Sequence, residues 1–216
     1  MTSNPESTNE TTIRVLIADD HAILRKGLVA ILDRTQTMQV VAEASNGREV
    51  IDLFHQYQPD ITLMDLRMPE VDGVEAIIRI RQTCPTARII VLTTYDGDED
   101  IYRGLRAGAK SYLLKDAPYE ELLGTIHSVH AGQPSLSKMV ADKLAQRLDQ
   151  EELSPRELQV LQRIAQGDAN KDIAGTLCIT EGTVKAHINA ILRKLGASDR
   201  TQAVMIAIKR GIIHPV

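Results

Sequence analysis

Acidic, hydroxyl and amino side chains follow or end four apolar runs in the first half of the sequence. In chain order they are Asp19, Asp20, Asp65, Thr93 and Lys115. Three neighbouring carboxylates repel one another unless a cation or protons lie between them, and Mg²⁺ takes carboxylate oxygens as ligands. A carboxylate can attack phosphorus to form an acyl phosphate, while a hydroxyl and an ammonium can hold phosphoryl oxygens. If these side chains meet, they have the parts for phosphorylating one aspartate.

The apolar runs that position these residues have the composition of strands in a parallel sheet. They are rich in Val, Ile and Leu, as strands buried on both faces are. The runs span residues 13–18, 38–44, 61–64, 88–93 and 111–114. Helical spacing of apolar residues between them, as at Leu24, Leu28 and Ile31, completes five strand–helix units and predicts an α/β domain. Ligands of such sheets bind beyond the carboxyl ends of the strands, so the polar side chains should converge there.

Each polar residue also has an ordinary structural interpretation when it is taken alone. Asp65 could be a turn residue, the Asp19–Asp20 pair a helix start, and Lys115 a surface lysine. Their joint position at the ends of several strands favours the functional interpretation.

Four segments resemble the receiver domain of bacterial two-component response regulators: VLIADDH, LMDLRMPEVDG, VLTTYD and SYLLKD. The resemblance covers residues 13–131 and implies a flavodoxin-like fold, with a five-stranded parallel sheet in the order 2-1-3-4-5. It implies that Asp65 is the phosphoacceptor. The implied Mg²⁺ ligands are Asp19, Asp20, Asp65 and the carbonyl of Arg67. The implied switch residues are Thr93, Tyr112 and the phosphate-pairing Lys115.

Only helical signals follow residue 131. Residues 132–149 predict a linker with a helical stretch. A capping box of Ser154 and Glu157 starts a helix, and Thr180 caps a longer one that ends before Gly196. A short helix between them and a tight turn at Cys178 make a helix-turn-helix candidate.

The longer of these helices is basic, with Glu181 as its one acidic residue. This composition suits contact with DNA phosphates and the major groove, although periodicity alone also fits a three-helix bundle with a solvated basic face. Residues 150–216 resemble the LuxR-type DNA-binding domain, which implies an all-α unit of four helices. The implied base-contacting residues are Lys185, Ala186 and Asn189, with Thr183 and Lys194 as phosphate contacts.

Both resemblances together are to NarL/FixJ-type response regulators. They imply a DNA-binding transcription regulator, not an enzyme, controlled by Mg²⁺-dependent phosphorylation of Asp65. The expected partners are a sensor histidine kinase, promoter DNA, RNA polymerase and, on phosphorylation, a second copy of the chain.

Two alternatives stay open. One is an enzyme, a phosphatase or phosphotransferase with an aspartyl-phosphate intermediate. The haloacid-dehalogenase class of such enzymes needs a second Asp two residues after its nucleophile, and Arg67 stands there. The other is a constitutive DNA-binding protein with a vestigial receiver.

Composition fits a cytoplasmic protein of two domains. No apolar run approaches the roughly 20 residues of a membrane span, and Cys84 and Cys178 lack metal-ligand spacing. Residues 1–12 are polar and predict a disordered tail. Residues 151–216 carry 9 Lys and Arg against 7 Asp and Glu, a net charge of +2. The net charge of the whole chain is −4, so residues 1–150 carry a net charge of −6. This asymmetry suggests different partners for the two domains.

Overall fold

The computed structural model describes residues 12–94, 97–133, 135–148 and 150–214. The chain divides into two compact units: residues 1–94 with 103–137, and residues 95–102 with 138–216. The disordered tail expected at residues 1–12 lies almost wholly outside the described residues.

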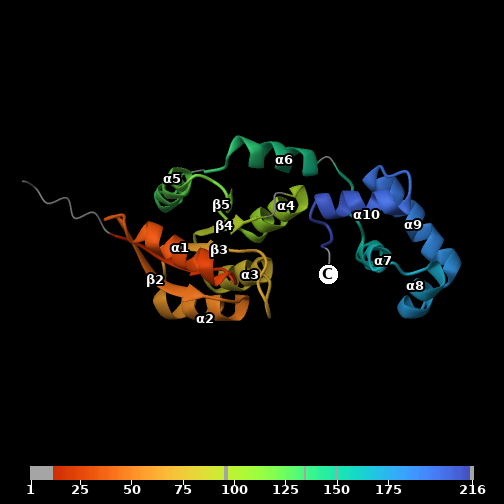
Figure 1. The fold of residues 1–216 in the computed structure, drawn as a ribbon, viewed down its shortest axis with the longest axis horizontal. Coiled ribbons are helices and arrows are strands. Elements are labelled where there is room, and N and C mark those ends of the chain that lie inside the picture. Colours follow the sequence, from red (N-terminus) through yellow and green to blue (C-terminus); the bar gives the residue numbers. More distant parts are fainter. Residues whose placement is uncertain (1–11, 95–96, 134, 149, 215–216) are drawn as a thin grey trace, which may run out of the picture. The chain divides into compact units, whose positions relative to one another are not determined.

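The first unit is built on a five-stranded sheet in the order β2-β1-β3-β4-β5, and every neighbouring pair of strands is parallel (Figure 1). The predicted fold is therefore confirmed, with the fourth strand starting one residue later than expected. The strands are β1 (Ile13–Ala18), β2 (Met38–Ala44), β3 (Ile61–Met64), β4 (Ile89–Thr93) and β5 (Ser111–Leu114).

Helices alternate with these strands and cover both faces of the sheet. They are α1 (Ala22–Leu32), α2 (Gly47–Tyr57), α3 (Gly73–Thr83), α4 (Asp98–Ala107) and α5 (Tyr119–His130). One face packs on α1 and α5, where Leu28, Leu32 and Ile126 join a core with strand residues such as Val15 and Leu63. The other face packs on α2 and α3 (Figure 1). In α1 it is Leu32 that is fully buried, whereas the expected Ile31 is only partly buried.

The second unit is helical among its described residues. Its helices are α6 (Lys138–Leu148), α7 (Pro155–Ala165), α8 (Asn170–Leu177), α9 (Glu181–Leu195) and α10 (Arg200–Lys209). The predicted capping box is present at the start of α7, and Thr180 caps α9 by accepting a hydrogen bond from the Thr183 N–H. Gly196, at φ 64°, ends α9 in the left-handed conformation that glycine adopts without strain. Apolar residues of α7 to α10 form one core that includes Val160, Ile173, Val184, Ile191 and Ala207.

The second unit also contains the first turn of α4, which contacts the end of α10. The Glu99 N–H donates to the carbonyl oxygen of Arg210 at 3.1 Å, and the Arg210 guanidinium lies 3.2 Å from the Asp98 carboxylate. Gly97 packs so closely on the same carbonyl that a Cβ there would lie 2.4 Å from the oxygen. This contact therefore requires glycine at residue 97.

The longest described helix, α9, has 15 residues, fewer than the roughly 20 that cross a bilayer. Among the described residues, every helix is too short or too polar to span a membrane.

Candidate functional site

The carboxyl ends of β1, β3 and β5 bring Asp19, Asp65 and Lys115 into direct contact. The Lys115 ammonium lies 2.7 Å from Asp19 Oδ2 and donates to Asp65 Oδ2 at 2.6 Å. All three side chains are at least 93% buried. The Lys115 N–H donates to the carbonyl oxygen of Thr93 at 2.9 Å, which ties the end of β5 to the end of β4. The structure thus brings together residues that lie up to 96 positions apart in the sequence.

Burial and charge act in opposite directions on this cluster. Burial raises the pKa of Asp65, although the Lys115 ammonium and the Arg67 N–H, 3.3 Å from Asp65 Oδ1, work to lower it. Burial alone would lower the pKa of Lys115, but its hydrogen bonds to Asp19 and Asp65 outweigh that effect and raise it. The Asp65 carboxylate is therefore poorly solvated, and further positive charge near it would favour its ionised form.

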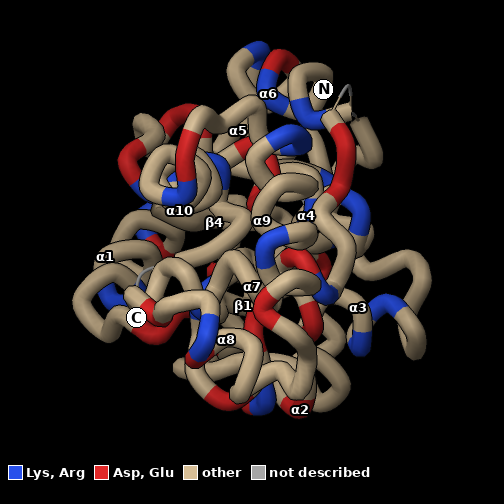
Figure 2. Tube along the Cα trace, turned by 90° about the vertical axis from the view of Figure 1, so that its right-hand side faces the viewer, with Lys and Arg blue, Asp and Glu red and all other residues tan. Residues whose placement is uncertain are grey.

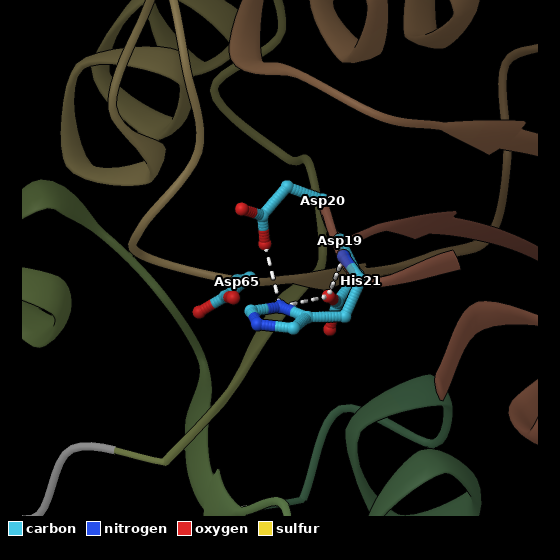
Figure 3. A group of neighbouring side chains, drawn as sticks. All are labelled: Asp19, Asp20, His21 and Asp65. Carbon is cyan, nitrogen blue, oxygen red and sulfur yellow. Dashed lines mark hydrogen bonds and ion pairs between the residues drawn. The ribbon is translucent and has the colours of Figure 1, made fainter. Parts of the chain in front are cut away.

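Asp20 and His21 lie beside Asp19 and Asp65 at the carboxyl edge of the sheet, which we call the acidic edge (Figure 3). Asp20 is exposed, and His21 Nδ1 lies 2.7 Å from Asp20 Oδ1 and 3.2 Å from Asp19 Oδ1. One ligand atom from each of Asp19, Asp20, His21 and Asp65 lies within 4.8 Å of the others. Several carboxylate oxygens at this spacing fit a hard divalent cation such as Mg²⁺.

The loop after β3 folds back tightly onto Asp65. A Cβ on Gly73 would lie 2.0 Å from the Asp65 carbonyl oxygen, so residue 73 has to be glycine for the chain to pass. The Gly73 N–H donates to Leu66 O at 2.8 Å, and the Asp72 side chain caps α3 by accepting from the Glu75 N–H. This sharp turn keeps Arg67 beside Asp65, which directly follows the last residue of β3.

The two remaining residues expected at this site lie on β4 and β5. Thr93, the last residue of β4, and Tyr112, in β5, are both fully buried. Their backbone positions put them on the strands that end beside the acidic edge.

Sequence reasoning missed His21. The signal that could have found it is its position directly after Asp20 and directly before α1, where its backbone N–H donates to Asp19 Oδ1 at 2.8 Å. The sequence did not show that its ring turns back toward both carboxylates.

Helix α9 presents the expected DNA-contacting residues to solvent. Val184, Ile191 and Leu195 hold one face of α9 in the core. The exposed residues on the remainder include Thr183, Lys185, Ala186 and Asn189. Lys194 differs from them, because its ammonium lies 2.7 Å from Glu157 Oε2 and 2.9 Å from the Glu152 carbonyl oxygen. A phosphate contact by Lys194 would have to compete with that ion pair.

The distribution of charged residues along the chain does not by itself mark the expected DNA-contacting residues. Lys and Arg are interspersed with Asp and Glu along the trace (Figure 2). The shape and exposure of α9 are therefore more informative than the net charge.

Each of the two units matches a known protein family. Residues 15–127 match the response regulator receiver domain, and residues 151–207 match the luxR family of bacterial regulatory proteins. The chain belongs to the LuxR-type response regulators. It is thus a DNA-binding transcription regulator of a two-component system, as the sequence predicted.

Full-length relatives support this assignment. The chain is 41% identical over 210 residues to the transcriptional regulatory protein LiaR of Bacillus subtilis, an alignment that covers 94% of this chain and 100% of LiaR. It is 37% identical over 208 residues to the response regulator protein VraR of Staphylococcus aureus, covering 94% of this chain and 100% of VraR.

Solved structures show the same architecture. The response regulator ChrA of a heme-sensing two-component system matches with a TM-score of 0.56 and 37% identity, covering 94% of this response regulator and 99% of ChrA. RcsB of Salmonella enterica, bound to promoter rprA in the presence of the phosphomimetic BeF3-, matches with a TM-score of 0.65 and 25% identity. That match covers 91% of this response regulator and 98% of the RcsB chain.

Proposed function

We propose that Asp65 accepts a phosphoryl group from a histidine kinase and that this phosphorylation controls the binding of α9 to promoter DNA. The observation that carries the proposal is the position of Lys115, whose ammonium bridges Asp65 and Asp19 at the carboxyl edge of the sheet. Asp65 is the carboxylate that this lysine contacts at the end of the central strand β3, where a phosphoryl group would meet the ammonium.

The phosphoryl transfer is a substitution at phosphorus. An Asp65 oxygen attacks the phosphorus of a phosphohistidine, an O–P bond forms and the P–N bond breaks, leaving the electron pair on the imidazole nitrogen. Lys115 turns from bridging two carboxylates to pairing with a phosphoryl oxygen, and the hydroxyl of Thr93 donates to another.

We propose Mg²⁺ as the cofactor of this site. The ion supplies positive charge against the phosphoryl oxygens. Its ligands would be Asp19, Asp20, Asp65 and the carbonyl of Arg67. The grouped carboxylates support this assignment, since their mutual repulsion is relieved by a bound cation.

On the DNA side, we propose that α9 lies in the major groove. Lys185, Ala186 and Asn189 would face base edges, and Thr183 and Lys194 would contact phosphates. Asn189 can donate to and accept from one adenine, so it would contribute to sequence preference. The partly exposed Val204 and Ile208 on α10 would contact a second copy of the chain, with Ala203 and Ala207 buried in the core.

The proposed setting is the cytoplasm, where a kinase domain, promoter DNA and RNA polymerase are all accessible. Cys84 and Cys178 are free thiols, which fits a reducing compartment. A turnover enzyme is the less favoured function, because Arg67 occupies the position where haloacid-dehalogenase enzymes carry a second acid.

Mass spectrometry after treatment with acetyl phosphate and Mg²⁺ tests the proposal. The expected result is one added phosphoryl group, lost at alkaline pH, in the natural protein and in the Asp116→Asn control, an exposed aspartate next to Lys115. Asp65→Asn should stay unlabelled. Full labelling of Asp65→Asn would refute the assignment, and steady hydrolysis of a small phosphoester would favour the enzyme instead.

A further inference from the structure

We propose that His21 is an additional ligand of the cation site and raises the affinity of the site for borderline transition ions, such as Co²⁺ and Zn²⁺, relative to Mg²⁺. The inference rests on the proposed function, since it uses the same site. It goes beyond that function by adding a nitrogen ligand and a second class of metal ion.

The position of the His21 ring points to this role. His21 precedes the first residue of α1, yet its side chain makes no capping hydrogen bond to that helix. Its Nδ1 instead faces two carboxylates, 2.7 Å from Asp20 Oδ1 and 3.2 Å from Asp19 Oδ1 (Figure 3). A ring nitrogen held between two carboxylate oxygens belongs to a group of atoms that can share one positive charge.

The backbone fixes this arrangement. The His21 N–H donates to Asp19 Oδ1 at 2.8 Å, which holds the residue beside the end of β1. Asp19 is itself fixed by Lys115. The His21 ring, by contrast, is 69% exposed, so it can adjust without disturbing the core. The site therefore combines one rigid carboxylate with one adjustable imidazole.

The spacing of the four ligand atoms suits a single ion after a small closure. The atoms from Asp19, Asp20, His21 and Asp65 lie within 4.8 Å of one another. Two ligands on opposite sides of one ion stand about 4.2 Å apart when each bond is about 2.1 Å. The side chains of His21 and Asp20 are exposed and can move to close the site around an ion.

The type of ligand atom decides which metal ions bind more tightly when His21 joins the site. Mg²⁺ takes oxygen ligands and keeps several waters, so an imidazole adds little to its binding. Co²⁺ and Zn²⁺ accept imidazole nitrogen readily and bind mixed nitrogen and oxygen sites more tightly than Mg²⁺ does. Binding through Nδ1 would exchange the contacts of this nitrogen with the two carboxylates for a bond from its lone pair to the ion.

Calorimetric titration of the full-length protein with MgCl₂ and, separately, with CoCl₂ tests the proposal. The variants are His21→Ala and the control His55→Ala, which removes an exposed histidine from α2. His21→Ala should weaken Co²⁺ binding by at least about 10-fold. Mutating a residue that only supports a metal ligand already weakens metal binding by about 10- to 100-fold, so loss of a ligand should cost at least the lower figure. Mg²⁺ binding should change by less than about 2-fold, and His55→Ala should leave both ions unaffected.

A spectroscopic measurement locates the nitrogen directly. In ¹H–¹⁵N spectra of the Co²⁺-loaded protein, a paramagnetically shifted histidine ring signal should be present in the natural protein and in His55→Ala, and absent in His21→Ala. Mg²⁺ binding with an unchanged Co²⁺ affinity in His21→Ala would overturn the proposal while leaving the Mg²⁺ site standing. An equal loss for both ions would also overturn it, because His21 would then only orient Asp20. If the natural protein binds neither ion, the proposed Mg²⁺ site fails together with the inference.

Discussion

At the scale of single residues, Lys115 places a positive charge between two buried carboxylates. Its ammonium contacts Asp19 and Asp65, which are 2% and 3% exposed. Removing one partner of a buried ion pair leaves an uncompensated charge and costs about 3–5 kcal/mol. We expect Lys115→Ala to lose about that much free energy of unfolding in metal-free urea titrations, and the exposed control Lys110→Ala to lose less than about 0.5 kcal/mol. Saturating Mg²⁺ should increase the free energy of unfolding of Lys115→Ala more than that of the natural protein. Equal increases would contradict the idea that Lys115 compensates the charge of the two carboxylates.

Asp65 gives a prediction about pH. Burial raises its pKa in the folded protein above its value in the unfolded chain. A raised pKa contributes stability that is present below the unfolded value of 3.8 and is lost as the pH rises through the folded value. Asp65→Asn should therefore raise the free energy of unfolding without metal at pH 7, and the gain should shrink at pH 4. The control Asp116→Asn changes an exposed aspartate and should alter the free energy of unfolding by less than about 0.5 kcal/mol. If Asp65→Asn raises the free energy of unfolding equally at pH 7 and pH 4, the charge of the Asp65 carboxylate is not the cause of the increase.

The sequence was sufficient to predict some of these residue positions but not others. Asp19, Asp65 and Lys115 could be placed together because parallel strands carry their carboxyl ends to one edge. The His21 ring could not be placed, because its direction depends on side-chain torsions and on its contacts with Asp19 and Asp20 rather than on periodicity. The ion pair of Lys194 with Glu157 joins residues 37 apart on two helices, and only the packing of α7 against α9 brings them together.

At the scale of elements, strands and helices were predicted closely because strong local signals mark them. Apolar runs gave all five strands, and Ser154 and Thr180 marked the starts of α7 and α9. The contact between the first turn of α4 and the end of α10 had no such signal. Gly97 and Arg210 are 113 residues apart, and nothing in the local sequence relates them.

That contact gives a test of element packing. Gly97→Ala would put a Cβ 2.4 Å from the Arg210 carbonyl oxygen, so the Glu99 N–H would lose its partner there. We expect a loss of about 1–3 kcal/mol, as for other overpacked positions, and faster amide exchange at Glu99. The matched control is Gly124→Ala in α5, where a Cβ meets nothing within 4 Å and alanine should stabilise the helix by about 0.5–1 kcal/mol. Unchanged exchange at Glu99 would show that the contact does not form in solution.

At the scale of the whole molecule, the proposed function couples phosphorylation of Asp65 to DNA binding by α9. A modification shifts an equilibrium only by as much as it favours one state over the other. The candidate favoured state is a dimer that uses the partly exposed Val204 and Ile208 and sets two copies of α9 about one DNA turn apart. A coupling of about 1–3 kcal/mol corresponds to roughly 5- to 150-fold tighter binding.

Five samples should be titrated at fixed salt against one DNA site selected from a random library. They are unmodified protein, phosphorylated protein, donor-treated Asp65→Asn, and Lys185→Ala in its unmodified and phosphorylated states. We expect the phosphorylated protein to bind roughly 5- to 150-fold more tightly than unmodified protein. Asp65→Asn should bind like unmodified protein. Lys185→Ala should bind more weakly in both states but keep the ratio between them, because Lys185 is exposed on α9 and, in the proposed function, contacts DNA after the phosphorylation step. Equal affinities of unmodified and phosphorylated protein at every concentration would show that the receiver acts on an output other than DNA affinity.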